Sequence, residues 1–208
     1  ADVDPDSFGI CVATTDGHVY EVGDSRLPFT IQSISKPFAY GLALGDQGRN
    51  RVLAKVGVEP TGEAFNSIRL AADSGRPLKP MVNAGAIATT SLVAGDSPSD
   101  RLHRLLATLS LYAGRKLGLD LDVYRSEAET GHRNRAIAHL LRNFSILEGD
   151  PDEPVDLYFR QCSISVTCLD LSLMAATLAN GGVNPITRER AIGSELVPRV
   201  LSVMTTCG

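Results

Sequence analysis

The chain lacks long apolar runs, clusters of basic residues and any secretory signal pattern. No apolar stretch approaches the roughly 20 residues that a transmembrane helix needs, so we expect no membrane span. The net charge is −4 over 208 residues, and the absence of a basic run argues against nucleic acid as a partner. The residues Ala1-Asp2-Val3-Asp4 lack the basic-then-apolar pattern of a secretory signal. We therefore expect a cytoplasmic location.

The chain also lacks the spacings by which cysteine and histidine bind metals. Neither Cys-x-x-Cys nor His-x-x-x-His occurs. A chain with room for a substantial core does not need disulfides, so we expect reduced cysteines packed as small hydrophobic residues. We expect no metal and no cofactor. The residues concerned are Cys11, Cys162, Cys168, Cys207, His18, His103, His132 and His139.

The chain has the proportions of hydrophobic and charged residues that are usual for a globular protein, and it has one clear β-strand pattern. With 43% hydrophobic and 21% charged residues, it is typical of a folded globular protein, and residues 1–208 are enough for one domain or two small ones. The runs 8–14 and 18–22 are rich in strand formers, and Asp16-Gly17 lies between them. This pattern predicts a β-hairpin.

After the hairpin, strand signals almost stop and helical periodicity takes over. Thr167 and Asp170 have the spacing of a capping box, which indicates where one helix begins. We expect helices over 38–44, 83–93, 100–117, the second half of 127–141, 171–178 and 195–204, and one short turn over 156–161. The prediction is a largely helical α+β fold with an N-terminal hairpin. Because a lone hairpin is marginally stable, either the helices cover it or its partner strands lie beyond Gly208.

Ser33 and Lys36 are the strongest candidates for chemistry. In a helix, residues three apart share a face, so a hydroxyl and an amine at these positions can meet. A serine hydroxyl needs a neighbouring base to become a good nucleophile, and a lysine can be that base only if its pKa is lowered. The preceding residues 29–32 look extended, which places the pair at a strand-to-helix transition. Taken alone, the same spacing is also typical of a solvated helix face.

Six short blocks of sequence extend this observation along nearly the whole chain. They are Phe29-Thr30-Ile31-Gln32-Ser33-Ile34-Ser35-Lys36-Pro37; Glu59-Pro60-Thr61-Gly62 with Phe65-Asn66-Ser67; Pro80-Met81-Val82-Asn83-Ala84-Gly85-Ala86-Ile87; Ser126-Glu127 with Arg133-Asn134-Arg135-Ala136-Ile137-Ala138; Tyr158-Phe159-Arg160-Gln161-Cys162-Ser163-Ile164; and Leu178-Ala179-Asn180-Gly181-Gly182. In these blocks and in their order, the chain resembles the serine-dependent glutaminases. That family shares the fold of β-lactamases and penicillin-binding proteins.

The resemblance implies hydrolysis of L-glutamine to L-glutamate and ammonia through a serine acyl-enzyme. It implies that Ser33 is the nucleophile and Lys36 its base. It also implies a homodimer or homotetramer. The substrate would be bound by Ser33, Asn83, Glu127, Asn134 and Tyr158.

The chemistry of these side chains suits a free amino acid. Glu127 can pair with a buried ammonium group. The amide and phenol groups of Asn83, Asn134 and Tyr158 can bind a carboxylate and a carboxamide. The developing oxyanion needs preorganised donors, and the backbone N–H of Ser33 can be one of them.

Each of these residues also has a purely structural alternative. Asn83 can cap a helix, and Tyr158 can belong to the core with its hydroxyl at the surface. Asn134 lies among charged residues and can be exposed. Glu127 can pair with Arg125 or Arg133 on a solvated face. The co-occurrence of all six blocks favours the functional interpretation.

The resemblance is incomplete at both ends of the chain. The family usually has a Tyr-Ile-Pro block before the hairpin, and it continues past Cys207-Gly208 into a Met-Tyr segment and a Lys-Ser-Gly-Val strand. Those elements supply a site tyrosine, a second oxyanion donor and sheet strands. We therefore expect a glutaminase domain that is truncated at both ends, and we expect these 208 residues alone to be inactive.

Two other functions remain open from the sequence. One is a different serine acyl-transfer enzyme on the same fold, such as a β-lactamase or D,D-peptidase. The absence of a Ser-Asp-Asn block counts against it. The other is a module that binds an amino acid without turning it over.

Overall fold

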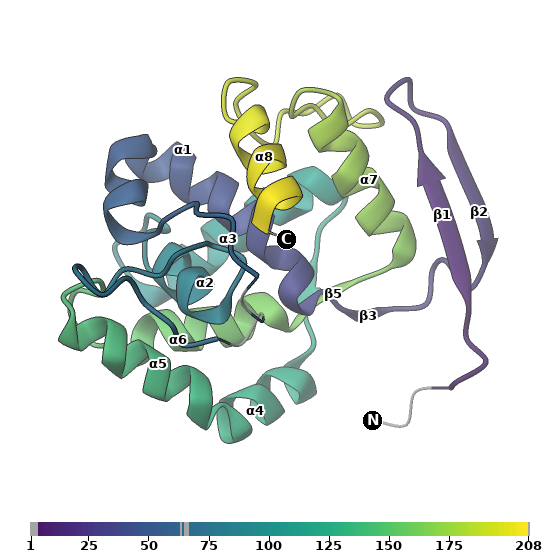
Figure 1. Ribbon diagram of the computed structural model, residues 1–208. Coiled ribbons are helices and arrows are strands. Elements are labelled where there is room, and N and C mark those ends of the chain that lie inside the picture. The colour runs from purple at the N-terminus through teal and green to yellow at the C-terminus, as the bar shows by residue number, and fades with distance from the viewer. Residues whose placement is uncertain (1–3, 63, 65–66, 208) are drawn as a thin grey trace.

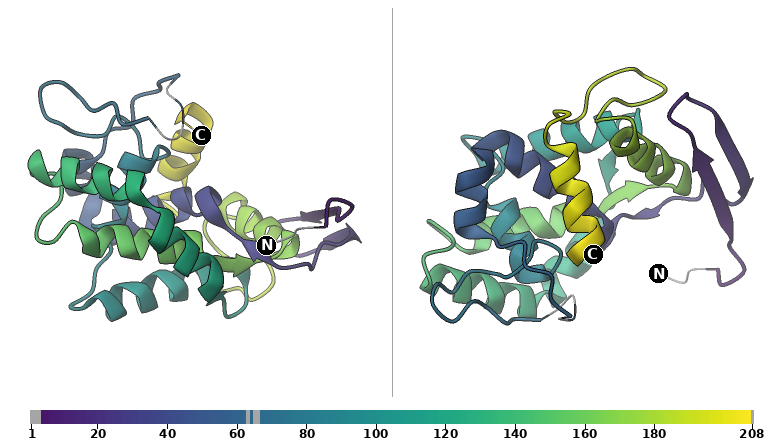
Figure 2. Two further views of the ribbon diagram at one scale, coloured as in Figure 1. Left: turned by 90° about the horizontal axis from the view of Figure 1, so that it is seen from below. Right: turned by 45° about the horizontal axis from the view of Figure 1, so that its top comes forward.

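The computed structural model describes residues 4–62, 64 and 67–207 of the chain. A body of packed helices has a β-hairpin at one side, and the hairpin projects from the body in each view (Figures 1 and 2). This arrangement confirms the predicted largely helical α+β fold with an N-terminal hairpin. Part of the second family block, Phe65-Asn66, lies outside the described residues.

The hairpin consists of β1 (Gly9–Ala13) and β2 (Val19–Gly23), which pair antiparallel with Cys11 opposite Glu21. Alternate residues of β1 are half-buried, and β1 packs against α7 (Cys168–Ala179). The intervening side chains face away from α7 and are exposed. The hairpin therefore has one face on the helical body and one apolar face open to solvent, formed by Ile10, Val12, Tyr20 and Val22.

A second, smaller sheet corrects the expectation that strands nearly stop after the hairpin. β3 (Phe29–Thr30), β5 (Ile164–Val166) and β4 (Gly118–Leu119) pair antiparallel in the order β3-β5-β4. Strands of two or three residues are too short to show an alternating pattern. Beyond β3, the N–H of Ile31 donates to Ile164 O at 2.8 Å. This pairing holds the chain just before Ser33.

The helices agree with the predicted ones in place but differ in extent. α1 continues through Gly45 and bends at Gly48, whose positive φ of 73° a glycine tolerates. The stretch 127–141 is divided between two helices, α4 and α5, which Gly131 separates. The bounds are α1 (Lys36–Lys55), α2 (Asn83–Thr90), α3 (Pro98–Ala113), α4 (Leu121–Thr130), α5 (His132–Asn143), α6 (Asp152–Cys162) and α8 (Val197–Cys207); a 3₁₀ turn, η1 (Gln32–Ser35), precedes α1.

α6 is a full helix where a single turn was expected over 156–161. Its first residues include Asp152, Glu153 and Pro154, which look like a loop in the sequence. In the first turn of a helix, however, acidic residues favour the helix dipole and proline loses no hydrogen bond. These residues therefore start the helix.

Buried side chains form two apolar clusters that meet at α6. One joins α1, α3, α7 and α8, where Phe38 and Tyr112 make an edge-to-face contact with ring centroids 4.9 Å apart. The other joins α2, α5 and α6. Leu157 belongs to the first cluster, and its neighbours Tyr158 and Phe159 belong to the second. Both faces of α6 are therefore packed, which holds Tyr158 in a defined position.

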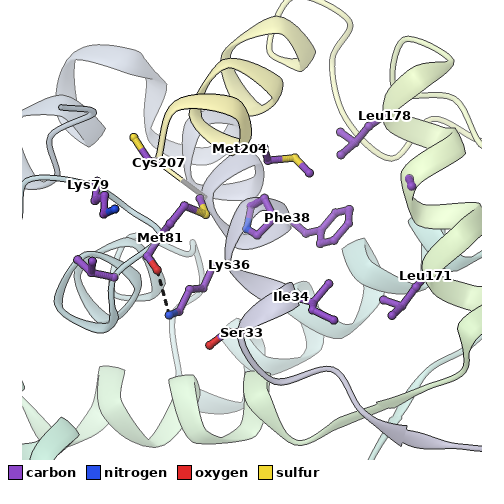
Figure 3. A pocket seen from close by; sticks show the side chains of 13 residues that line it. Ser33, Ile34, Lys36, Phe38, Lys79, Met81, Leu171, Leu178, Met204 and Cys207 are labelled. Atoms are coloured by element: carbon purple, nitrogen blue, oxygen red, sulfur yellow. Dashed lines mark hydrogen bonds between the residues drawn. The ribbon is translucent and has the colours of Figure 1, made fainter. Parts of the chain in front are cut away.

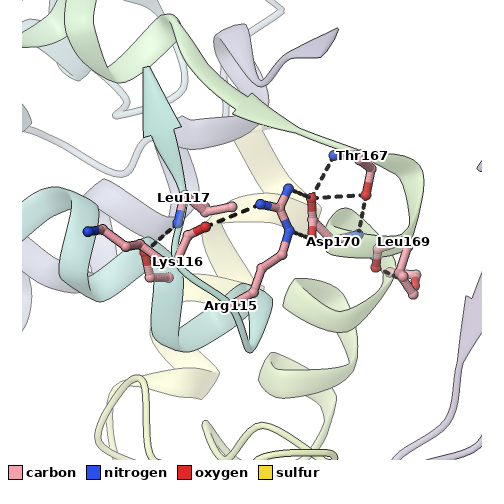
Figure 4. A network of polar contacts seen from close by, with 8 residues as sticks. Arg115, Lys116, Leu117, Thr167, Leu169 and Asp170 are labelled. Carbon is pink, nitrogen blue, oxygen red and sulfur yellow. Dashed lines mark hydrogen bonds and ion pairs between the residues drawn. The ribbon is translucent and has the colours of Figure 1, made fainter. Parts of the chain in front are cut away.

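The start of α7 is tied to the end of α3 by a charged network (Figure 4). Arg115 donates to both carboxylate oxygens of Asp170, at 2.7 and 2.5 Å, and Asp170 is only 2% exposed. Asp170 also accepts from the backbone N–H of Thr167 at 2.7 Å, while the Thr167 hydroxyl accepts from Asp170 N. The predicted capping box is confirmed, and the arginine completes the carboxylate's hydrogen bonds.

Candidate active site

Ser33 lies in the turn η1, between β3 and α1, so the predicted strand-to-helix transition is confirmed. The residue before it, Gln32, has a positive φ of 48°, which non-glycine residues rarely adopt. The carbonyl of Ser33 accepts the backbone N–H of Lys36. The Ser33 side chain is exposed to solvent, and its N–H lies at the start of the turn, where donors have no intrahelical partner.

Lys36 is the first residue of α1 and is only 2% exposed. Its Nζ donates to Met81 O at 3.1 Å and to Asn83 Oδ1 at 2.8 Å, and both acceptors are neutral. Burial lowers the pKa of this ammonium from 10.5 to about 8, and the nearby Cys162 thiol acts in the opposite direction. An amine with this pKa is partly neutral near physiological pH, as a proton acceptor must be.

The predicted binding residues surround these acceptors. Asn83 Nδ2 donates to Asn134 Oδ1 at 3.1 Å, and the Tyr158 hydroxyl donates to Asn83 Oδ1 at 3.4 Å. Asn83 does not cap its helix, because Val82 is the N-cap residue and the amide points to Lys36. The structure thus places Lys36, Asn83, Asn134 and Tyr158 in one hydrogen-bonded group.

Tyr158 is a core residue, but its hydroxyl faces the site and not the surface. It is 3% exposed, and burial raises the pKa of this phenol well above 10. Cys162 and Glu127 act on the pKa in the same direction, whereas the Ser33 hydroxyl lowers it. Tyr158 therefore stays protonated and acts as a hydrogen-bond donor.

Glu127 lies on α4 and reaches the same region through Gln32. Gln32 Nε2 donates to Glu127 Oε1 at 3.4 Å. Arg125, one of its proposed surface partners, pairs instead with Asp122 at 3.0 Å. Glu127 therefore lies beside the turn η1 that holds Ser33.

An open cavity of about 770 Å³ borders this polar group on one side (Figure 3). Ser33 and Lys36 lie at one end of the cavity, and Leu171 and Leu178 of α7 lie across from them. Its walls are mostly apolar, and Asn83, Glu127, Asn134 and Tyr158 do not line it. Ser33 and Lys36 thus stand between an apolar cavity and a polar cluster. The polar cluster is the part suited to an amino acid.

Two glutamines near the site were not singled out in the sequence. Gln32 bonds Glu127, and Gln161 bonds Ser35, the residue before Lys36. Both belong to family blocks, but no residue spacing marks their side chains as partners. Among the described residues, no three His, Cys, Asp or Glu side chains are grouped to hold a metal ion. In the same residues, no helix is both long and apolar enough to cross a membrane.

Chemically, the site holds an exposed serine hydroxyl and a buried amine of lowered pKa that line the same cavity, beside amide, phenol and carboxylate groups. The bonds of the Lys36 amine described above go to Met81 and Asn83 and not to Ser33. Such a combination of groups is typical of serine hydrolases that use an amine as base, and comparison with known proteins agrees with it. The family model described as Glutaminase matches residues 1–208, and the chain belongs to this family.

Individual relatives are similar along the whole chain. A glutaminase of Trichormus variabilis is 58% identical over 208 residues, which are 100% of this chain and 62% of that protein. Glutaminase 2 of Bradyrhizobium diazoefficiens is 57% identical over 98% of this chain and 32% of its own length. The chain thus spans less than two thirds of these relatives.

Solved structures show the same fold. The structure of Mglu in its glutamate form superposes with a TM-score of 0.94 at 46% identity, covering 100% of this chain and 48% of that one. A probable glutaminase, ybaS, superposes with a TM-score of 0.94 at 42% identity, covering 99% and 67%.

Proposed function

We propose that the whole protein hydrolyses L-glutamine to L-glutamate and ammonia, and that residues 1–208 form one glutaminase domain within it. The observation that carries this proposal is Lys36, a buried amine whose pKa is about 8 and whose acceptors are all neutral, three residues from Ser33. Family membership and a relative's structure in its glutamate form support the substrate.

In the first half-reaction, Ser33 Oγ attacks the side-chain amide carbon of glutamine while neutral Lys36 takes its proton. The C–N bond of the tetrahedral intermediate then breaks, and Lys36 returns the proton to the leaving nitrogen, which departs as ammonia. The backbone N–H of Ser33 stabilises the oxyanion. A water molecule then attacks the acyl carbon while Lys36 takes one of its protons. The bond between that carbon and Ser33 Oγ breaks, Lys36 returns the proton to Ser33 Oγ, and glutamate leaves.

The polar cluster positions the substrate for this attack. Glu127 pairs with the substrate ammonium, and Asn83, Asn134 and Tyr158 donate to its oxygens. Because Tyr158 stays protonated, its hydroxyl has a proton to donate to a substrate oxygen. A site that pairs all these groups rejects analogues that leave one of them unpaired. From the family resemblance we also propose a homodimer or homotetramer, which light scattering measures directly.

The test is Ser33→Ala in the whole protein, with ammonia release and L-glutamate binding measured separately. We expect turnover to fall by at least about 10⁴-fold while calorimetry still detects glutamate, because only the nucleophile is lost. Ser74→Ala, which changes an exposed loop serine, is the matched control.

Three outcomes would contradict the proposal. Activity within a few-fold of the wild type in Ser33→Ala would exclude Ser33 as nucleophile. Glutamine binding without ammonia release by the wild-type protein would favour an amino-acid-binding module. Hydrolysis of a β-lactam in preference to glutamine would favour the other acyl-transfer enzymes.

A further inference from the structure

The amide of Gln161 on α6 lies between two buried hydroxyl groups. Gln161 Nε2 donates to Ser35 Oγ at 2.9 Å, and Thr90 Oγ1 lies 3.1 Å from Gln161 Oε1. All three residues are 0% exposed. Because buried polar groups without partners are costly, this chain of hydrogen bonds fixes each side chain in place.

The chain of hydrogen bonds has a single direction at Ser35. The Ser35 hydroxyl donates its only proton to the carbonyl of Gln32, at 2.6 Å. Its oxygen therefore needs a donor, which the amide nitrogen of Gln161 supplies. If the amide were reversed, its oxygen would compete with Gln32 O for the same proton. The chain Gln161–Ser35–Gln32 thus ends on the backbone directly before Ser33.

That backbone is in a conformation that needs support. Gln32 has a φ of 48°, in the left-handed region that costs a residue with a Cβ atom about 1–2 kcal/mol. Such a conformation persists only where the surroundings hold it. The bond from Ser35 to the Gln32 carbonyl supplies that support from inside the protein.

The same hydrogen bonds connect the three elements that carry the site. Thr90 ends α2, which begins with Asn83. Gln161 lies three residues after Tyr158 on α6, so the two side chains share a helix face. Ser35 belongs to the turn η1 that holds Ser33, so this set of bonds joins all three elements beneath the site.

We propose that Gln161 is a positioning residue that acts through Ser35. It holds the Gln32 backbone in its left-handed conformation and so aims the Ser33 hydroxyl at the substrate amide. This inference rests on the proposed function, because it concerns the same nucleophile. We call the two hydrogen bonds from Gln161 to Ser35 and from Ser35 to Gln32 the relay. Breaking the relay should slow the acylation of Ser33 while leaving substrate binding almost unchanged.

The test compares Gln161→Met and Ser35→Ala in the whole protein, with Thr177→Val as the matched control. Thr177 is also 0% exposed and donates to Leu173 O at 2.8 Å on α7, outside the relay. The kcat of both relay variants should fall about 10- to 100-fold, because small displacements of reacting groups are that costly. The Kd for L-glutamate should change by less than about threefold. The control should keep its kcat.

Active-site titration separates positioning from loss of folded protein. An electrophilic glutamine analogue that acylates Ser33 counts the competent sites, and kcat is expressed per titrated site. A purely structural role would lower the number of sites and the melting temperature but not the rate per site. The double variant should be about as slow as either single variant, because both break the same chain of bonds.

The inference is overturned if either relay variant keeps its rate per site within about threefold of the wild type while Ser33→Ala is inactive. It is also overturned if Thr177→Val slows turnover as much as Ser35→Ala, since any buried hydroxyl would then suffice. Activity in Ser33→Ala would instead refute the proposed function, so the two failures are distinguishable. If Gln161→Met does not fold, Ser35→Ala decides the question alone.

Discussion

At the scale of single residues, Lys36 shows how burial in the fold lowers the pKa of an amine. The side chain is almost completely buried, yet it bonds only a carbonyl and an amide oxygen. The nearby Cys162 thiol has its pKa raised to about 12 by burial and stays neutral. Among the described residues, the Lys36 ammonium bonds only neutral acceptors, so its burial favours the neutral amine.

This arrangement makes the stability contribution of Lys36 depend on pH. The folded pKa of about 8 lies below the ordinary value of 10.5, so the unfolded chain binds more protons between these values. The free energy of unfolding therefore rises with pH over this window, by about 3 kcal/mol at most from this group. Below pH 8 both states are protonated and the contribution is constant.

We predict that Lys36→Met abolishes this dependence. Denaturant unfolding of the whole protein at pH 7.5 and pH 10.5 should show the wild type gaining stability relative to the variant as pH rises. The stability difference between wild type and variant should change by about 2–3 kcal/mol across the window. A constant difference would mean that the amine has an ordinary pKa.

At the scale of elements, α2 owes its position to a close backbone contact. A Cβ atom on Gly85 would lie 2.0 Å from Lys79 O and 2.9 Å from Pro80 Cα. The backbone that Gly85 touches continues to Met81 and Asn83, whose oxygens accept from Lys36. Any side chain at Gly85 would therefore displace the hydrogen-bond partners of Lys36.

We predict that Gly85→Ala destabilises the protein by about 1–3 kcal/mol, as overpacking of a tight contact does. Gly45→Ala is the matched control, because a Cβ atom there meets only Leu196 Cδ1 at an ordinary 3.8 Å. In the control, the gain in helix propensity should stabilise the protein by up to about 1 kcal/mol. Equal stability of the two variants would contradict the role of Gly85.

At the scale of the whole molecule, two apolar surfaces lack cover among the described residues. The outer face of the hairpin exposes Ile10, Val12, Tyr20 and Val22, with exposed fractions of 50–66%. The cavity beside Ser33 is open and mostly apolar. The Ser33 hydroxyl lines this cavity and is exposed to solvent.

We expect a polypeptide of these 208 residues to release no measurable ammonia from glutamine. One reason is that the cavity beside Ser33 is open. The other is that the chain spans only 62% of the length of the Trichormus variabilis glutaminase. An ammonia assay on this polypeptide tests the expectation, and that relative is the positive control. Turnover comparable to the relative would show that the described residues contain a sufficient site.

Several elements could be predicted because their signals are local. Asp16-Gly17 between two alternating runs predicts the hairpin, and Thr167 with Asp170 predicts the start of α7. The strands β4 and β5 could not be predicted, because their pairing joins residues more than 40 positions apart. The site residues were predicted through the six blocks, and the structure brings Lys36 and its partners together, whereas their catalytic roles stay predictions.

The sequence by itself determined the fold class, the family and the identity of the candidate nucleophile and base, since each depends on residue types in a linear order. Only the tertiary structure decided that Lys36 is desolvated among neutral acceptors. These acceptors, Met81 O and Asn83 Oδ1, reach Lys36 because α2 and the residues before it pack against α1. Only the structure joined Gln161 to the turn before Ser33. That contact spans 126 positions of the chain, and no local pattern encodes a hydrogen bond between side chains so far apart in sequence.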